Sequence, residues 1–524
     1  MSISVTTPAY AGTASNPWLI AVLVALATFM EVLDTTIANV ALPHIAGSMG
    51  VSADESSWVV TTYLVANAVI LTASGYLAKM LGRKTFFLVS LALFTLASVL
   101  CGLSWNLQSL LLFRLLQGLG GGGMVPVSQS ILAEAFPPEK RGQGFALWGI
   151  AVVAAPVVGP TLGGWLSDNY SWTWCFLINA PVGLATIGLI SAILHEPNKS
   201  REEHGRNFDL VGFLLVATFL GALELVLDRG QQDDWLGSDF IVTSALICAL
   251  AGILMIPWEI TRREPVIDMR MLATRQFATS LIVMLAAGAI LLSTTQFVPQ
   301  LVQQNFGYTA TWAGLALSPG GVVTMVMMMV AGRLSSVVQP KYLIVAGAVI
   351  VAASMYQMTA IYGDLSFWFF AQSRMLLALG LPLIILPIIS ASYDGLPAGK
   401  TDQASALLNV ARNTGSSIGI ALVSNVLAHR EQFHQSRLIE HLVQSSTQYQ
   451  ITLQQITRYF LDHGSSALQA QQQATGWIGQ QVQQQATFLA YVDAFWVLML
   501  VALSIVLLAL MLRKVKLGVA PMGH

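Results

Sequence analysis

Residues 18–43, WLIAVLVALATFMEVLDTTIANVALP, decide how this chain folds. The stretch is long and apolar enough to cross a bilayer, because a membrane-spanning helix needs about 20 such residues. Two carboxylates, Glu31 and Asp34, nevertheless stand close to its middle. An acid at the centre of a spanning helix costs roughly 2.5–3.5 kcal/mol on insertion scales, so it usually serves a function and faces protein or water. At about 100° per residue, one face of about 140° gathers the polar side chains Thr28, Glu31, Asp34, Thr35 and Asn39.

The composition of the whole chain indicates an integral membrane protein. Of 524 residues, 55% are hydrophobic and 10% are charged, whereas soluble domains carry about 25% charged residues. The net charge of −1 and the lack of a large basic cluster argue against nucleic acid as a partner. Cys101, Cys175 and Cys248 lie in separate apolar segments and lack the spacing of a metal site or a disulfide framework. No charged region precedes the first apolar run, so we expect a retained span rather than a cleaved signal.

Apolar runs of spanning length recur along the chain and predict an all-α protein with fourteen transmembrane helices. Eighteen lysines and arginines fall in loops on the side of the two termini, and four fall on the other side. This bias predicts that both termini are cytoplasmic. The predicted spans are 18–42, 58–78, 85–104, 108–132, 143–166, 174–194, 209–228, 239–258, 277–302, 311–332, 342–362, 366–390, 405–428 and 487–512.

The polar, glutamine-rich segment 429–486 between the last two predicted spans allows two interpretations. It is either a solvated linker or a helical extracytoplasmic element that contacts a partner protein. The length of the segment favours neither strongly, since long loops are either functional or disordered.

An internal duplication relates the two ends of the chain. A shift of 260 residues superimposes Arg114 on Arg374 and the loop FPPEKRGQ (136–143) on LPAGKTDQ (396–403). The shift predicts a six-helix half at 1–200, two inserted helices at 201–262 and a second six-helix half at 263–524. Two such parallel repeats describe the major facilitator architecture, with a substrate site between the halves. The same shift places Thr294 opposite Asp34, so the second half lacks that acid.

Three motifs carry a family resemblance. GYLAKMLGRK (75–84) resembles the signature of the major facilitator superfamily, although Lys79 stands where the family usually has Asp. LLFRLLQGLGGGG (111–123) resembles its Arg-x-x-Gln-Gly motif, and APVVGPTLGG (155–164) resembles the motif of its proton antiporters. We expect gating and close helix packing from glycines, a bent helix from proline and membrane-surface anchoring from the basic pair. These residues are Gly75, Gly82, Arg83, Lys84, Gly159, Pro160, Gly163 and Gly164.

The depths of Arg114 and Asp34 in their helices agree to roughly 3 Å, at 1.5 Å per residue. A buried arginine needs an acidic partner, so the two side chains are predicted to pair. The pair is either a permanent structural contact or a device by which Arg114 tunes the proton affinity of Asp34. Glu31 ranks second as a proton-coupling residue because no partner for it is evident from the sequence.

Further stretches narrow the resemblance: LDTTIANVALPHI (33–45), WTWCFLINAPVG (172–183), LDRGQQDDWL (227–236) and YTATWAGLALSPGG (308–321). Together with fourteen spans and a long last loop, they make the chain similar to drug:proton antiporters of the EmrB/QacA type, the EmrB branch in particular. The resemblance implies export of amphipathic or lipophilic toxic compounds across the bacterial inner membrane, driven by a proton gradient without another cofactor. It also implies a periplasmic membrane-fusion adaptor (EmrA-like) and an outer-membrane channel (TolC-like).

Two other functions were weighed against multidrug export. One is export of a single physiological compound such as a fatty acid, bile salt or siderophore. The other, an intramembrane enzyme or receptor, is disfavoured because the spans contain no HExxH, catalytic Asp pair or nucleophile–base motif. The predicted substrate cavity comprises Thr35, Asn39, Gln117, Gln129, Thr294, Gln296 and Asn409.

Weaker candidates are the remaining polar residues of the spans. For Glu224 and Asp228, solvation near the membrane surface is favoured over proton coupling. Arg374 lacks an acid in the equivalent span and is paired provisionally with Asp493. Arg412 belongs to a polar patch for which helix packing is the default interpretation.

Overall fold

Long apolar helices build the computed structural model, which describes residues 16–136, 141–194, 209–262, 265–363, 365–392, 401–442 and 446–514. Those ranges contain helices and their connections, with no strand. The first helices in chain order are α1 (Pro17–Met49), α2 (Ala53–Leu81), α3 (Arg83–Gly102), α4 (Leu107–Gly121), α5 (Met124–Ala135), α6 (Arg141–Asn169), α7 (Trp174–Leu177) and α8 (Asn179–Ile193). The chain continues with α9 (Leu210–Arg229), α10 (Asp239–Thr261), α11 (Arg275–Phe306), α12 (Ala310–Val337), α13 (Pro340–Met358), α14 (Phe367–Ser392), α15 (Thr401–His441), α16 (Thr447–Asp462) and α17 (Ala467–Leu510).

Twelve of the predicted spans are recovered as stretches long and apolar enough to cross a membrane, among the residues that the structure describes. One of them, Leu107–Leu132, contains α4 and most of α5, which meet at Gly122 and Gly123. The other two predicted spans correspond to α6 and α15. Both are long helices packed in the bundle, α6 against α1 and α15 against α11. Their passage through the membrane therefore stays a prediction.

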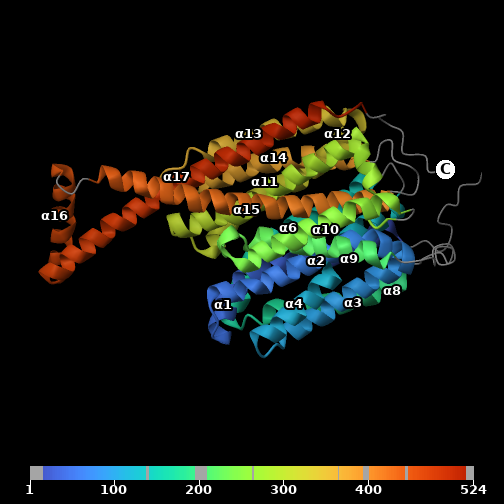
Figure 1. The fold of residues 1–524 in the computed structure, drawn as a ribbon, viewed down its shortest axis with the longest axis horizontal. Helices are drawn as coiled ribbons and strands as arrows, with labels where there is room; N and C mark the ends of the chain where they lie inside the picture. The colour runs from blue at the N-terminus through green and yellow to red at the C-terminus, as the bar shows by residue number, and fades with distance from the viewer. Residues whose placement is uncertain are drawn as a thin grey trace, which may run out of the picture.

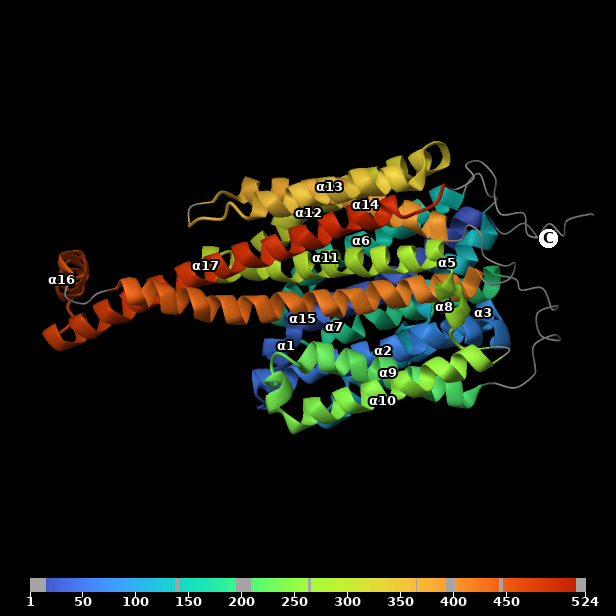
Figure 2. The ribbon, with the colours of Figure 1, turned by 45° about the horizontal axis from the view of Figure 1, so that its top comes forward.

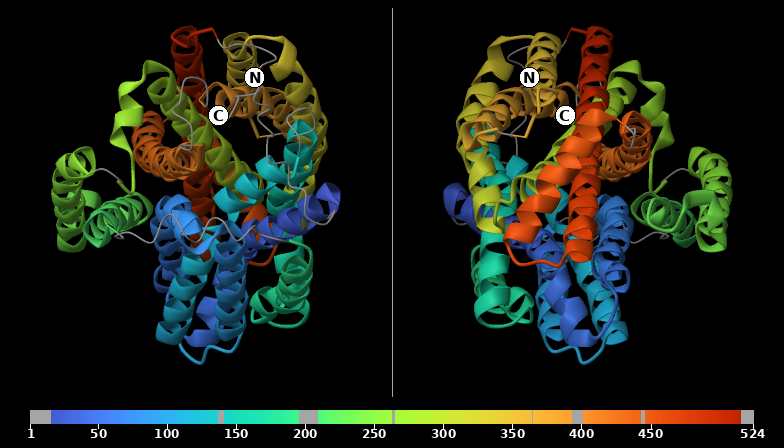
Figure 3. Two further views of the ribbon diagram at one scale, coloured as in Figure 1. Left: turned by 90° about the vertical axis from the view of Figure 1, so that its right-hand side faces the viewer. Right: turned by 90° about the vertical axis from the view of Figure 1, so that its left-hand side faces the viewer.

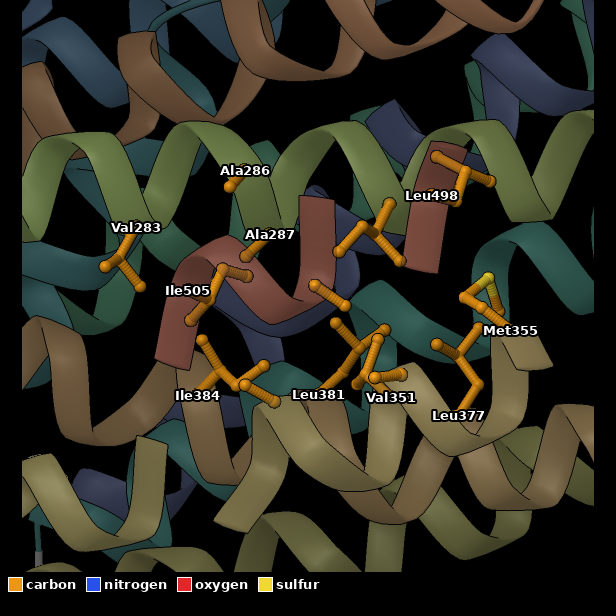
Figure 4. Close-up of a cluster of buried hydrophobic side chains, with 14 of the residues drawn as sticks. Val283, Ala286, Ala287, Val351, Met355, Leu377, Leu381, Ile384, Leu498 and Ile505 are labelled. Carbon is orange, nitrogen blue, oxygen red and sulfur yellow. The ribbon is translucent and has the colours of Figure 1, made fainter. Parts of the chain in front are cut away.

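Two groups of helices lie side by side, and we call α1–α8 the N-terminal half and α11–α17 the C-terminal half. Viewed along the bundle, most of the N-terminal half lies below the C-terminal half, and the pair α9–α10 lies to one side of both (Figure 3). Apolar side chains of α11, α13, α14 and α17 form one large buried cluster within the C-terminal half (Figure 4). Other buried clusters occupy the N-terminal half. The halves meet where α6 packs on α12 and where α2 packs on α15, while α9 contacts both α2 and α15.

A helical projection extends beyond one end of the bundle. We call this end of the bundle the projecting end. α15 has 41 residues and α17 has 44, so at 1.5 Å per residue each is about 60 Å long, twice the roughly 30 Å of a hydrocarbon core. Both helices run out of the bundle at the same end and carry α16 at the tip (Figures 1 and 2). Most of segment 429–486 is therefore helical, and its contact with a partner protein stays a prediction.

Glycines at equivalent positions of the two halves allow equivalent close contacts. A Cβ atom on Gly120 would lie 2.5 Å from the backbone of Phe94 in α3, and one on Gly380 would lie 2.6 Å from the carbonyl oxygen of Gly347 in α13. Real Cβ atoms do not approach other atoms so closely, so α4 and α14 can pack on their neighbours only with glycine. The offset of 260 residues thus corresponds to a repeated mode of packing.

Candidate functional site

Asp34 is the centre of a buried polar network on α1. Its side chain is 1% exposed and accepts hydrogen bonds from three side chains of other helices. Arg114 Nη1 lies 2.6 Å from Oδ2, and both Gln117 Nε2 and Asn179 Nδ2 lie 2.8 Å from Oδ1. All three partners are donors, so the contacts suit the ionised carboxylate, which only accepts. The predicted pairing of Asp34 with Arg114 is confirmed.

Arg114 is fully buried and held from several directions. Nε donates to the Val59 carbonyl at 3.0 Å, and Nη1 also donates to Gln117 Oε1 at 2.8 Å. The guanidinium carbon lies 4.5 Å from the centre of the Tyr63 ring, which is within the range of a cation–π contact. α4 can reach Val59 and Tyr63 because Gly118 faces α2, where a Cβ would lie 2.4 Å from a carbonyl oxygen.

Glu31, one turn before Asp34, has a different environment. It is 6% exposed and accepts one hydrogen bond at Oε1, from Asn67 Nδ2 at 3.1 Å. Oε2 is buried without a hydrogen-bond partner among the described residues. The charge of Arg412 in α15 acts on Glu31 from the other half of the protein. Asp34 is therefore saturated with donors, whereas Glu31 has an oxygen at which a proton can bind without breaking a hydrogen bond.

The C-terminal half repeats this geometry without the acid. Arg374 Nη1 donates to Thr294 Oγ1 at 3.1 Å, and Nη2 donates to Thr295 Oγ1 at 2.9 Å. The provisional pairing of Arg374 with Asp493 is wrong. Asp493 instead accepts from Arg430 Nε at 2.6 Å and lies 2.7 Å from His434 Nε2. Both of these partners belong to α15 and lie near the projecting end, so the carboxylate is already occupied.

Hydrogen bonds also connect the two halves. Gln129 Oε1 in α5 accepts from Asn409 Nδ2 at 3.0 Å and from Ser405 Oγ at 3.2 Å, both in α15. The predicted cavity residues Gln129 and Asn409 are thus brought together, and they form a contact between the halves.

Glu224 and Asp228 attach α9 to both halves. Glu224 is 7% exposed and accepts from Ser417 Oγ of α15 at 2.6 Å. Asp228 accepts from Thr61 of α2. The expectation that these acids are solvated near the membrane surface is wrong for Glu224, because α15 covers it and supplies a donor.

The basic pair of the first motif contacts other helices of the N-terminal half. Arg83 pairs with Glu134, and Lys84 Nζ donates to the Ser191 carbonyl at 2.8 Å. Gly82 has φ of 86° where α2 passes into α3, a conformation that favours glycine.

Close packing of α6 on α1 depends on the glycines of the third motif. Cβ atoms on Gly159 and Gly163 would lie 2.0 Å from Thr36 Oγ1 and 3.3 Å from Ile37. Gly164 is less confined, with Val40 at 3.9 Å. The backbone of Pro160 lies within α6, and its side chain lies outside the described residues, as does that of Lys79.

Other predicted cavity residues do not converge. Thr35 Oγ1 bonds within its own helix to the Val32 carbonyl, and Asn39 and Gln296 are exposed. None of the three lines either of the two small cavities found between α2 and α15, each of about 10 Å³. Gly75 lines one of these cavities, and Glu224 lines the other.

Two members of the site were missed by sequence reasoning. Asn179 opens α8, donates to Asp34 and also donates to Ser98 Oγ at 2.9 Å. Asn67 on α2 donates to Glu31. Asn179 lies in the stretch WTWCFLINAPVG, so a polar residue inside an apolar run was an available signal. Neither asparagine has a counterpart 260 residues further along the chain. The comparison of the two halves therefore could not single them out, because it selects residues that match at that offset.

Comparison with known proteins agrees with this architecture. The Major Facilitator Superfamily model matches residues 24–420. The multidrug export protein EmrB of Haemophilus influenzae is 35% identical over 479 residues, which are 91% of this chain and 92% of that protein. The fatty acid resistance protein FarB of Neisseria gonorrhoeae is 36% identical over 444 residues, 84% of this chain and 86% of that protein.

A solved structure shows the same fold. The human organic anion transporter MFSD10 (TETRAN) matches 93% of this chain and all of its own chain, with a TM-score of 0.57 and 14% identity. The family model covers most of the chain and both bacterial relatives match along nearly all of it. The chain therefore belongs to the major facilitator superfamily, as a multi-pass membrane transporter of the EmrB/QacA-type multidrug exporter family.

Proposed function

We propose that this protein is a proton-coupled antiporter of the bacterial inner membrane, with cytoplasmic termini, which exports amphipathic or lipophilic toxic compounds. The observation that carries the proposal is the buried carboxylate of Asp34, which is held by donors only and paired with Arg114 at 2.6 Å. Proton-coupled transporters need an intramembrane acid whose charge can change, and we expect the helix that carries this acid, α1, to line the substrate site between the halves.

The proposed switch follows from the hydrogen bonds of the two acids. A proton from outside first binds Glu31, whose Oε2 has no hydrogen-bond partner in the described part of the chain. Transfer of a proton to Asp34 removes the negative charge opposite Arg114. The arginine is then left as an uncompensated charge in a low-dielectric interior, which destabilises that conformation and favours another arrangement of the halves. Each proton that moves down a potential of 100 mV supplies roughly 2.3 kcal/mol.

The exporter is further proposed to work within a tripartite pump. The projection formed by α15, α16 and α17 (Figure 1) leaves the bundle at the end opposite the one where α1 begins. With cytoplasmic termini, this end faces the periplasm. A periplasmic adaptor (EmrA-like) would contact the projection, and an outer-membrane channel (TolC-like) would complete the export route.

The second candidate function is export of one physiological compound, in particular a fatty acid. Similarity to FarB, whose name describes fatty acid resistance, is as high as similarity to EmrB. Arg374 in the C-terminal half, which has no acidic partner among the described residues, also favours an anionic substrate. A panel of cationic, neutral and anionic compounds separates the two candidates, since a dedicated exporter acts on one class only.

The test of proton coupling is Asp34→Asn in inverted membrane vesicles. The amide can retain hydrogen bonds but does not titrate, so we expect normal membrane insertion and loss of proton-driven drug efflux. Glu440→Gln is the matched control, because Glu440 lies on an exposed surface of α15 and pairs with Arg437 there. Full proton-driven transport by Asp34→Asn would contradict the proposed role of Asp34.

A further inference from the structure

Arg374 is an intramembrane cation whose hydrogen-bond partners in the described residues are both hydroxyl groups. Thr294 and Thr295 accept at 3.1 and 2.9 Å, and no acidic side chain pairs with the guanidinium there. Buried charges in proteins are generally paired with opposite charges or bind ions. Two neutral hydroxyl groups satisfy two N–H donors but leave the positive charge uncompensated.

The surroundings of Arg374 are shaped to hold an arginine. A Cβ on Gly320 of α12 would lie 2.5 Å from Arg374 Cγ, so the arginine stem passes where only glycine leaves space. Apolar neighbours along the same helices, Phe297 in α11 and Leu377 in α14, are buried in the main cluster of this half. The guanidinium is therefore positioned from three helices, α11, α12 and α14.

The N-terminal half shows what is missing at this position. The offset of 260 residues that relates Arg374 to Arg114 also relates Thr294 to Asp34. Arg114 is fully buried and bound to the carboxylate of Asp34. Arg374 is only partly buried. It bonds to Thr294, whose shorter, neutral side chain stands where the carboxylate would be. The C-terminal half thus retains the arginine without the carboxylate that pairs with its counterpart in the N-terminal half.

We propose that Arg374, Thr294 and Thr295 form a binding subsite for the anionic headgroup of an exported amphiphile. The guanidinium presents parallel N–H donors that match a carboxylate. The two hydroxyl groups donate to the Ile290 and Leu291 carbonyls of their own helix and accept from the guanidinium, so they hold it in place. The apolar part of the ligand would lie in the region between the halves. This inference rests on the proposed export function and specifies a substrate class for it.

The test supplies the missing acid from the protein itself. Thr294→Asp should pair with Arg374 as Asp34 pairs with Arg114 and should abolish binding of dodecanoate to the purified full-length protein. Thr294→Asn is the matched control, because it has nearly the same size without the charge and should retain binding. Arg374→Gln should weaken dodecanoate binding about tenfold or more. Binding of dodecyltrimethylammonium, which has the same chain and a positive charge, should not weaken in either Thr294→Asp or Arg374→Gln.

Binding is measured as the ligand-induced rise in the thermal unfolding midpoint in detergent, which needs no proton gradient. Failure of proton coupling therefore leaves this test valid. Equal binding of dodecanoate by wild-type protein, Thr294→Asp and Arg374→Gln would overturn the subsite. Loss of both probes in Thr294→Asp would also overturn it, since a charge-specific site affects one probe only.

A lipid headgroup carries the same anionic chemistry as an exported carboxylate. The measurement is therefore repeated in nanodiscs of phosphatidylcholine with and without phosphatidylglycerol. Competition that depends on Arg374 would identify the lipid as an occupant of the anion subsite and overturn its assignment to an exported substrate. Retained dodecanoate binding in the presence of phosphatidylglycerol supports that assignment.

Discussion

The pairs Asp34–Arg114 and Thr294–Arg374 occupy equivalent places in the two halves and differ in charge. The arginine to threonine distance of 3.1 Å is close to the arginine to aspartate distance of 2.6 Å. The repeat has therefore preserved the contact between the two helices while only one half retains the acid. Packing can be maintained with either side chain, which supports our proposal that the acid of the N-terminal half has a role beyond joining α1 to α4.

The largest change in the free energy of unfolding is expected when the Asp34–Arg114 pair is broken. Variants of this pair separate its structural role from its proposed functional role. Arg114→Met alone leaves a buried carboxylate without its counter-ion and should lower the free energy of unfolding by about 3–5 kcal/mol. The double variant Asp34→Leu with Arg114→Met should recover most of that loss, because replacing a buried pair by apolar side chains is often neutral. Unfolding in mixed micelles of increasing denaturing detergent measures both changes.

Efflux in inverted vesicles completes this comparison. We expect no proton-driven transport from the double variant despite its restored stability. Transport by the double variant at the wild-type rate would mean that the pair is only a structural contact. As the matched control in the C-terminal half, Arg374→Met should lower stability by less than Arg114→Met. It leaves two neutral hydroxyl groups that still donate to backbone carbonyls of α11, instead of a buried charge.

The sequence was sufficient to predict the Asp34–Arg114 contact. A buried arginine needs an acid, and few acids lie at the same depth in a neighbouring helix, so the possible partners of Arg114 are limited. The same reasoning failed for Arg374 and Asp493. Depth does not report the direction in which a helix turns its side chains, and Asp493 faces Arg430 of α15. The prediction that Glu224 is solvated failed for a related reason. Whether α15 buries this side chain depends on how the inserted helices pack, which the sequence does not show.

The sequence predicted the membrane-spanning helices better than the segments that connect or interrupt them. Hydropathy located the bundle, because apolar length is a direct requirement of the bilayer. It could not show that segment 429–486 continues α15 and α17 as helices, since glutamine-rich helices outside the membrane have no apolar signal. It also could not show the break between α4 and α5 at Gly122 and Gly123, because a hydropathy window averages over such a change.

A prediction of intermediate size concerns the feature that both halves share. Gly159→Val should wedge α6 away from α1, and Gly419→Val should wedge α15 away from α11, where a Cβ would lie 2.6 Å from Ala289. Both variants should lose about 1–3 kcal/mol of stability from overpacking. Gly476→Val in α17 is the control, because nothing lies within 4 Å of a Cβ there. A loss in only one of the two halves would show that the repeat has diverged in packing as well as in charge.

The smallest effect on the bundle is expected from the projection, which only the C-terminal half carries. Ile451, Tyr459 and Leu461 of α16 are 42%, 58% and 42% exposed, and we expect a partner protein to contact these apolar side chains at the tip of the projection. Changing these three residues to serine should alter stability by less than about 0.5 kcal/mol, since surface substitutions rarely do more. Vesicle efflux should stay at the wild-type rate because the Asp34 network is untouched.

Capture of the proposed periplasmic adaptor by the triple serine variant should fall below that by the exposed control variant Gln480→Ala. Unchanged capture would assign adaptor binding to another surface. Reduced vesicle efflux would instead connect the projection to the rocking of the halves. That connection would run through α15, because the helix that supports the projection also holds Gln129 of the N-terminal half through Asn409. The two halves would then differ in function in two ways, through the extended helix α15 and through the missing negative charge opposite Arg374.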